Sequence, residues 1–182
     1  MGAFYTSHTL RGPASSDVIA FLKDRRAYVS TSGSPVTIVL DEDCESQDGQ
    51  LLADLGARLS AHFRCPVLAV LNHDDDILYF ELYEDGEKTD EYNSNPAYFG
   101  EDDAEEGPSG GDASRLAAAF GAINAEVIES ILRRSDYVFE TKRHFELAAS
   151  LGIPAFAVGV GYRYADAGEF PPGVSKDTFI HT

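Results

Sequence analysis

The sequence contains no tryptophan, one methionine and only two cysteines, Cys44 and Cys65. Two cysteines form one disulfide at most, and their spacing is not that of a metal site, so a disulfide-rich fold and a cysteine-ligated metal centre are excluded. The carboxylates around Cys44 disfavour its thiolate, and we expect neither cysteine to act as a nucleophile.

Long apolar runs are also lacking. The longest, residues 66–71, has the length of a strand, whereas a membrane-spanning helix needs roughly 20 apolar residues. Residues 1–8 have neither the charged nor the apolar region of a signal peptide. We therefore expect a cytoplasmic protein with no membrane partner.

Basic residues are scarce: 14 Lys and Arg stand against 31 Asp and Glu, which gives a formal charge of -17. Affinity for nucleic acid comes mainly from Lys and Arg contacts with phosphate, so we expect no nucleic-acid partner. The sequence also has no Gly-x-Ser-x-Gly motif, no Gly-rich phosphate loop and no HExxH pairing of its five histidines. No catalytic residue can be named from a motif.

What the sequence does contain is apolar material for a core, 43% hydrophobic and 11% aromatic residues over 182 positions. The charge is concentrated in residues 74–106, where 14 acidic residues accompany the single Lys88. Within this acidic segment, residues 101–111 also carry Gly and Pro, as a mobile linker does. We expect a division into residues 1–100, a linker or loop at 101–111, and residues 112–182.

Apolar periodicity predicts an alternation of strands and helices in the first part. The predicted elements are a strand at 2–9, a short helix from Ser15, strands at 27–31 and 36–40, a helix at 51–63, and strands at 67–71, 77–83 and 87–92. This β-α-β-β-α-β order followed by a hairpin is the split pattern of ferredoxin-like α+β folds. We predict an α+β protein with an antiparallel sheet and its Leu55 and Leu59 helix face packed on the strand at 67–71.

The second part is predicted to be mainly helical and to pack on the first. Asp112, Asn124 and Thr141 can cap three successive helices. A closing strand is expected at 155–164, because Val158, Val160 and Tyr162 alternate there.

The third helix has an unusual first turn. Lys142, Arg143 and His144 occupy a position where the helix dipole favours acids. With Arg133 and Arg134 they form the densest basic cluster of the chain. We expect this cluster to face the acidic segment; the alternative is that it binds an external anionic ligand.

Asp74, Asp75 and Asp76 follow the predicted strand at 67–71 directly and are the strongest candidate for a metal site, because clustered carboxylates suit a hard cation. The alternative is a hairpin turn, since Asp and Asn are residues that turns prefer, and we favour the turn. Beyond possible weak binding of a divalent cation we expect no cofactor.

Aromatic residues set among carboxylates suggest an interface with a basic protein. The candidate partner-binding residues are Tyr92, Asn93, Tyr98, Phe99, Glu101, Asp102 and Asp103. The alternative is that these aromatic side chains belong to the core. The leading hypothesis is a non-enzymatic acidic binding module of the inhibitor or immunity type. A small metal-dependent enzyme using Asp74–Asp76 is the alternative, and a structural role stays open.

Overall fold

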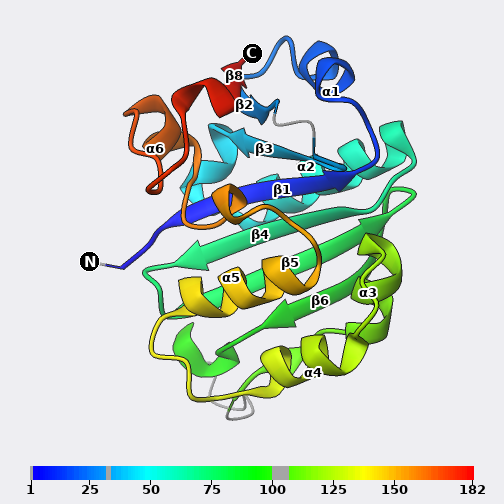
Figure 1. Ribbon diagram of the computed structural model, residues 1–182, viewed down its shortest axis with the longest axis vertical. Helices are drawn as coiled ribbons and strands as arrows, with labels where there is room; N and C mark the ends of the chain where they lie inside the picture. Colours follow the sequence, from blue (N-terminus) through cyan, green and yellow to red (C-terminus); the bar gives the residue numbers. More distant parts are fainter. Residues whose placement is uncertain (1, 32–33, 100–106) are drawn as a thin grey trace.

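The computed structural model describes residues 2–31, 34–99 and 107–182. Within these ranges eight strands form one sheet in the order β7-β6-β5-β4-β1-β3-β2-β8, and neighbouring strands are antiparallel (Figure 1). The strands are β1 (Tyr5–Arg11), β2 (Ala27–Ser30), β3 (Val36–Asp41), β4 (Val67–His73), β5 (Ile77–Glu84), β6 (Glu87–Asn93), β7 (Ser109–Gly110) and β8 (Phe179–His181). The predicted α+β class and antiparallel sheet are confirmed.

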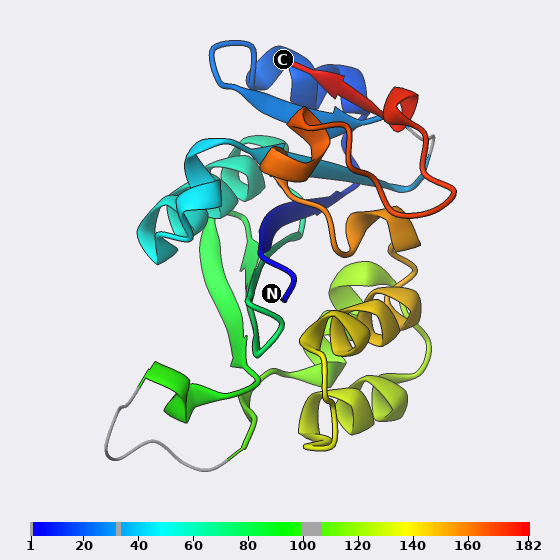
Figure 2. The same cartoon turned by 90° about the vertical axis from the view of Figure 1, so that its left-hand side faces the viewer.

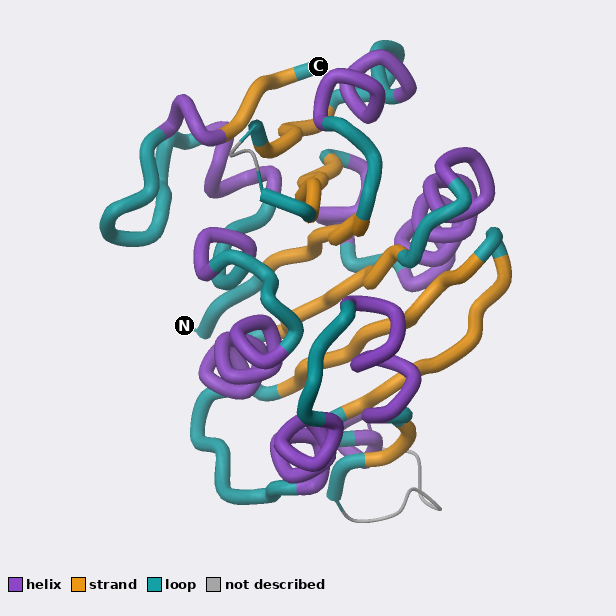
Figure 3. Tube along the Cα trace, turned by 45° about the vertical axis from the view of Figure 1, so that its right-hand side comes forward, coloured by secondary structure: helices purple, strands orange, loops and turns teal. Residues whose placement is uncertain are grey.

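Helices cover both faces of the sheet, so the molecule has three layers (Figures 2 and 3). One face carries α1 (Ser15–Phe21) and α2 (Gly49–Phe63). The helices of the other face are α3 (Ala113–Phe120), α4 (Ala125–Arg133), α5 (Glu140–Ser150) and the short α6 (Tyr162–Asp166). Along the chain the first elements run β1, α1, β2, β3, α2, β4, apart from a 3-10 turn at Asp43–Ser46, and the strands among them lie in the order β4-β1-β3-β2.

The central strands are buried on both sides because their side chains alternate between the two helical layers. Val67 and Ala69 of β4 pack with Leu55 and Leu59 of α2, as the sequence predicted. Leu68 and Val70 of the same strand contribute to the larger core beneath α3, α4 and α5.

The chain closes the sheet differently from our expectation. Residues 155–164, predicted as a strand, form a 3-10 turn (Ala155–Ala157) and the start of α6. Gly159 has φ of +77°, a left-handed conformation that interrupts a strand. The alternating apolar residues Val158, Val160 and Tyr162 are instead buried against the face of the sheet. The strand that closes this side is β8, which pairs with β2.

Gly161 lets this segment lie close against β1. A Cβ atom at Gly161 would meet Glu45 Oε1 at 2.1 Å and Tyr5 Cβ at 3.0 Å. The next amide, Tyr162 N, donates to the buried Glu45 carboxylate at 2.6 Å.

Part of the predicted linker at 101–111 is ordered. Ser109–Gly110 forms β7 on the edge of β6, and Arg133 donates to the carbonyl oxygens of Gly110 and Gly111. The rest of that linker, up to residue 106, lies outside the described residues. The division into residues 1–100 and 112–182 therefore stays a prediction, although helices of the second part pack on strands of the first.

Candidate functional site

The three aspartates Asp74, Asp75 and Asp76 form the turn between β4 and β5. Asp74 and Asp75 adopt left-handed backbone conformations, with φ of 51° and 66°. Each carboxylate has a partner: Asp74 accepts from Gly2 N at 2.9 Å, Asp75 from Thr141 N at 2.6 Å, and Asp76 from Tyr98 Oη at 3.3 Å. The turn is therefore held in place by three separate segments of the chain.

Asp75 joins this turn to the first residues of α5. Its carbonyl oxygen accepts from Glu140 N at 2.9 Å, in addition to the bond from Thr141 N to its side chain. Phe139, at the N-cap position, offers no capping side chain, so Asp75 satisfies two otherwise unpaired amides of α5 from 66 residues away. The predicted cap, Thr141, is a residue of the helix itself.

A cavity of about 310 Å³ lies where the β4–β5 turn, the end of β6 and the start of α5 converge, at the left of Figure 1. We call it the acidic cavity. It is lined by Asp75, Asp76, Ser94, Asn95, Gly107, Pro108, Ser135, Tyr137, Val138, Glu140 and Arg143.

A buried ion pair forms part of the wall of the acidic cavity. The Arg143 guanidinium, 2% exposed, donates from Nε and Nη2 to the Glu140 carboxylate at 2.7 and 3.2 Å. Its Nη1 donates to the carbonyl oxygens of Ile131 and Leu132, in the last turn of α4. Arg143 thus satisfies the end of α4 and is neutralised by Glu140, which explains its place in the first turn of α5.

The net negative charge of the cavity lining belongs to Asp75 and Asp76. Three carboxylates and one guanidinium line the cavity, and Glu140 is committed to Arg143. Asp75 Oδ2 and Asp76 Oδ1 accept no hydrogen bond from the described part of the chain. The cavity therefore offers two acceptor oxygens with negative charge, on side chains whose other oxygens are held.

Exposed apolar side chains lie at this cavity or next to residues that line it. Val138, which lines it, is 80% exposed, and the adjacent Phe139 is 60% exposed. Tyr98, 40% exposed, reaches Asp76 from the other side. We call Tyr98, Val138 and Phe139 the apolar rim.

Of the candidate partner-binding residues, Tyr92 is not at the surface. Its ring is fully buried against Phe80, and its hydroxyl donates to the Leu132 carbonyl at 2.8 Å. The alternation of β6 turns this residue into the core, which corrects its assignment to an interface. Asn93 is half-buried, with its side chain accepting from Asn95 N.

The other candidates at this end of the chain are described only in part. Tyr98 belongs to the apolar rim. The side chain of Phe99 and all of Glu101, Asp102 and Asp103 lie outside the described residues. Their proposed role in binding therefore stays a prediction.

The basic cluster meets the acidic segment in part, because Arg143 lines the acidic cavity together with Asp75 and Asp76. Among the described residues its ion pairs are local: Arg133 with Glu129, Arg134 with Asp136 and Glu146, Lys142 with Glu146, and Arg143 with Glu140. Acids within the same helices and their connecting loop provide nearer partners than residues 74–99.

His144 completes the first turn of α5 by contacting β1. Its Nδ1 lies 2.7 Å from the Tyr5 hydroxyl, and both side chains are buried. Burial lowers the pKa of His144 to about 4 and raises the pKa of Tyr5 far above its ordinary value. The pair is neutral and links α5 to β1; it does not line the acidic cavity.

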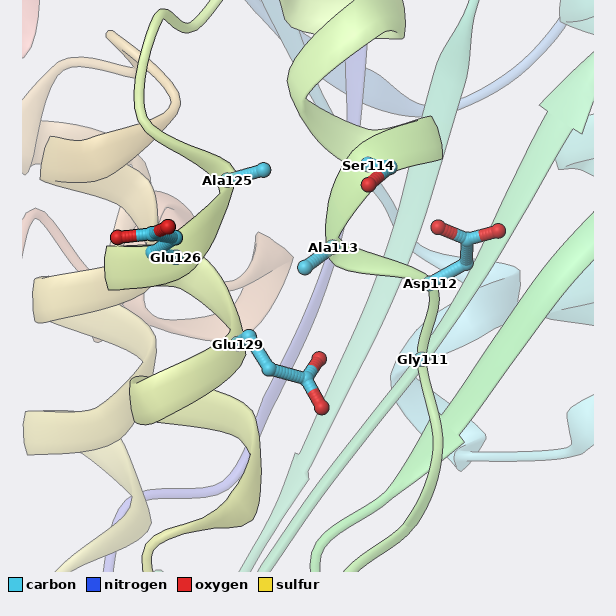
Figure 4. A pocket seen from close by; sticks show the side chains of 7 residues that line it. All are labelled: Gly111, Asp112, Ala113, Ser114, Ala125, Glu126 and Glu129. Carbon is cyan, nitrogen blue, oxygen red and sulfur yellow. The ribbon is translucent and has the colours of Figure 1, made fainter.

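A larger groove of about 530 Å³ lies between the N-terminal ends of α3 and α4 (Figure 4). The carboxylates of Asp112 and Glu126 point away from it, whereas Glu129 lies between the helices. Asp112 caps α3 by accepting from Arg115 N, and Glu129 pairs with Arg133. No set of free polar groups converges in this groove, so we place the candidate site at the acidic cavity.

The residues that the structure describes, 2–31, 34–99 and 107–182, also bear on metal and membrane binding. Within these ranges no group of three His, Cys, Asp or Glu side chains is arranged to hold a metal ion. Likewise, none of the helices described there combines the length and the apolar character needed to cross a membrane. Cys44 and Cys65 are free and buried, and burial raises the pKa of Cys65 to about 11 and that of Cys44 further.

Sequence reasoning missed Tyr137, Val138, Glu140 and Arg143 as members of one site with the aspartate turn. The available signal was the basic first turn of α5, which required partners for its charges; Arg143 finds them in Glu140 of the same turn and in the carbonyl oxygens that end α4. Comparisons of the chain with models of known protein families, with curated proteins and with solved structures found no match.

Proposed function

We propose that this protein is a non-enzymatic acidic binding module, of the inhibitor or immunity type, that engages a basic protein partner through the acidic cavity and its apolar rim. The observation that carries the proposal is the exposure of Val138 and Phe139 beside a cavity with two available carboxylate oxygens. Exposed aromatic and aliphatic side chains next to a polar cavity are typical of binding surfaces.

The overall charge supports the same proposal. A formal charge of -17 attracts basic partners over a distance and repels nucleic acid. Binding should therefore weaken with salt, because screening acts on the long-range attraction. The free, buried cysteines favour a reducing compartment, and we propose a cytoplasmic location.

We also propose that β1 to β4 with α1 and α2 form a ferredoxin-like unit. The antiparallel strand order β4-β1-β3-β2, with both helices on one face, supports this assignment. Helices α3 to α6 then form an added layer, and the acidic cavity lies outside the unit, beside the turn that follows β4.

Selection of a random peptide library on the immobilised protein tests the function. We expect enrichment of peptides that carry Lys or Arg beside apolar residues, with binding lost at about 0.5 M salt. Phe139→Asp should weaken these peptides at least tenfold.

Ile123→Asp is the matched control, because Ile123 is an exposed apolar residue in the α3–α4 connection and does not line the acidic cavity. A library that yields no basic peptides would contradict the proposal and favour a structural role. Equal binding by the Phe139 and Ile123 variants would place the interface elsewhere.

A further inference from the structure

We infer that the acidic cavity accepts an arginine side chain of the partner, flanked in the partner's sequence by an apolar residue that contacts the apolar rim. This inference rests on the proposed function and specifies its recognition chemistry. It begins with size: about 310 Å³ lies at the lower end of the range for ligand pockets, roughly 300–1,000 Å³. A single long side chain suits this volume better than a large ligand.

The acceptors of the cavity are fixed before any partner arrives. Asp75 is held through Oδ1 by Thr141 N, and Asp76 through Oδ2 by the Tyr98 hydroxyl. Within the described residues no donor reaches the second oxygen of either carboxylate, so an incoming donor can bind there. Because the two residues are adjacent in a turn that is itself anchored on α5, little side-chain entropy is lost when they bind.

The charge of the occupant follows from the lining. Glu140 and Arg143 neutralise one another through two hydrogen bonds, so the remaining charge is that of Asp75 and Asp76. A cation is the complementary occupant. Asn95 also lines the cavity, and its amide side chain carries a further acceptor oxygen.

A guanidinium fits this arrangement better than an ammonium. Guanidinium groups present a planar fork of donors that matches several separate carboxylate oxygens, and they are more weakly hydrated than an ammonium. Tyr137 is already engaged by the guanidinium groups of Arg134 and Arg143, at 4.1 and 4.4 Å from its ring centroid. Because this ring is already in contact with two guanidinium groups, the incoming arginine would be held by hydrogen bonds to Asp75 and Asp76 and not by stacking on Tyr137.

The apolar rim determines what flanks that arginine. Val138 lines the cavity and Phe139 follows it in the chain, so a residue next to the bound arginine lies against exposed apolar surface. Covering this surface gives hydrophobic stabilisation that a free arginine cannot supply.

The test uses three acetylated, amidated tripeptides in which Phe flanks a central Arg, Lys or citrulline, the uncharged isostere of Arg. Binding is followed by NMR through the amide signals of Asp75, Asp76, Asn95 and Val138. We expect saturable shifts with the Arg peptide, at least threefold weaker binding of the Lys peptide, and no binding of the citrulline peptide. A Gly-Arg-Gly peptide should bind at least threefold more weakly than its Phe-flanked counterpart.

Asp75→Asn and Asp76→Asn keep the oxygens that accept from Thr141 N and Tyr98 Oη but remove the charge. Together they should weaken the Arg peptide at least tenfold. Asp85→Asn is the control, because Asp85 is exposed and also adopts a left-handed conformation, in the turn at the other end of β5. If the double variant fails to fold, Asp76→Asn alone is measured, since Asp76 does not cap α5.

The outcomes distinguish the arginine site from the more general proposal that the protein binds a basic partner. Equal binding of the Lys and Arg peptides, or equal losses in the Asp76 and Asp85 variants, would overturn the arginine assignment while library-selected basic peptides still bind. Failure of every basic peptide, selected or synthetic, would overturn both. Shifts of the same signals by Mg²⁺ or Ca²⁺ that displace the Arg peptide would replace the arginine site with a cation site.

Discussion

The buried imidazole of His144 makes the stability of the fold depend on pH between neutral and about 4. In the folded protein burial lowers the pKa of His144 to about 4, against 6.5 for an exposed histidine. Below pH 6.5 the unfolded chain binds a proton on this residue that the folded chain does not accept until about pH 4. The stabilisation is therefore complete above pH 6.5 and is lost as the pH falls towards 4.

The size of this effect follows from the two pKa values. A pKa difference of about 2.5, at about 1.36 kcal/mol for each pKa unit, corresponds to roughly 3 kcal/mol over the full range. Between about pH 7.5 and about pH 5 the loss should be about 2 kcal/mol. His8, also buried and with a lowered pKa, acts with the same sign, whereas the raised pKa values of Glu45 and Asp90 act with the opposite sign.

The assay is urea unfolding of the wild type and His144→Gln at a series of pH values. The difference in unfolding free energy between the two proteins cancels the contributions of all other groups. This difference should fall by about 2 kcal/mol from pH 7.5 to pH 5, because Gln does not titrate. Tyr5→Phe is the control: it removes the hydroxyl near Nδ1 but leaves the imidazole buried, and its pH dependence should resemble that of the wild type.

A difference that stays constant within about 0.5 kcal/mol over this range would refute the reasoning. It would mean that His144 is protonated in the folded state or reaches water. A direct titration of the imidazole signals by NMR provides a second measurement, and protonation near pH 6 in the folded protein would contradict burial in the same way.

Three further predictions concern stability and metal binding. Arg143→Ala leaves Glu140 and two α4 carbonyl oxygens unpaired in a buried site, and it should lower the free energy of unfolding in urea melts by about 3–5 kcal/mol. Adding Glu140→Gln should recover part of this loss. Arg26→Ala, which breaks an exposed pair with Glu42, should cost under about 1 kcal/mol. Leu55→Ala should cost about 2–5 kcal/mol, and Leu51→Ala, on the same helix but 39% exposed, under about 1 kcal/mol. Asp75→Ala removes the acceptor of the Thr141 amide in α5 and should cost about 1 kcal/mol of stability, whereas Asp75→Asn retains this acceptor. A rise in Tm with Mg²⁺, Mn²⁺ or Ca²⁺ that Asp75→Asn abolishes would show a metal site and contradict a turn without bound metal.

The elements that could be predicted from the sequence are those whose signals are local. Helix α2 follows from the spacing of Leu52, Leu55 and Leu59, and β4 from a continuous apolar run. The turn at Asp74–Asp76 follows from its composition. Strand β8 has three residues, and its existence depends on the edge of β2 that it meets, so no pattern within residues 179–181 could reveal it.

The candidate site depends on contacts between distant segments. Asp75 caps a helix that begins 65 residues later, and Arg143 closes the end of the preceding helix. The sequence showed that the basic first turn of α5 needed a partner, but Glu140 beside it was not recognised as that partner. Tyr92 was placed at an interface because its aromatic ring lies among carboxylates in the sequence; the pleat of β6 directs it inward.

The pairing of β8 with β2 has a consequence for the order in which the protein is made. During synthesis β2 leaves the ribosome about 150 residues ahead of the strand that covers it, and until then its backbone amides and carbonyls face water on that side. Thr182 then bonds to Arg25 and Ala27 at the same edge. A ribosome that stalls before residue 179 would thus hold a nascent chain in which most of the sheet has formed but β2 has an open edge. That edge could pair with the nascent chains of neighbouring ribosomes on the same messenger RNA.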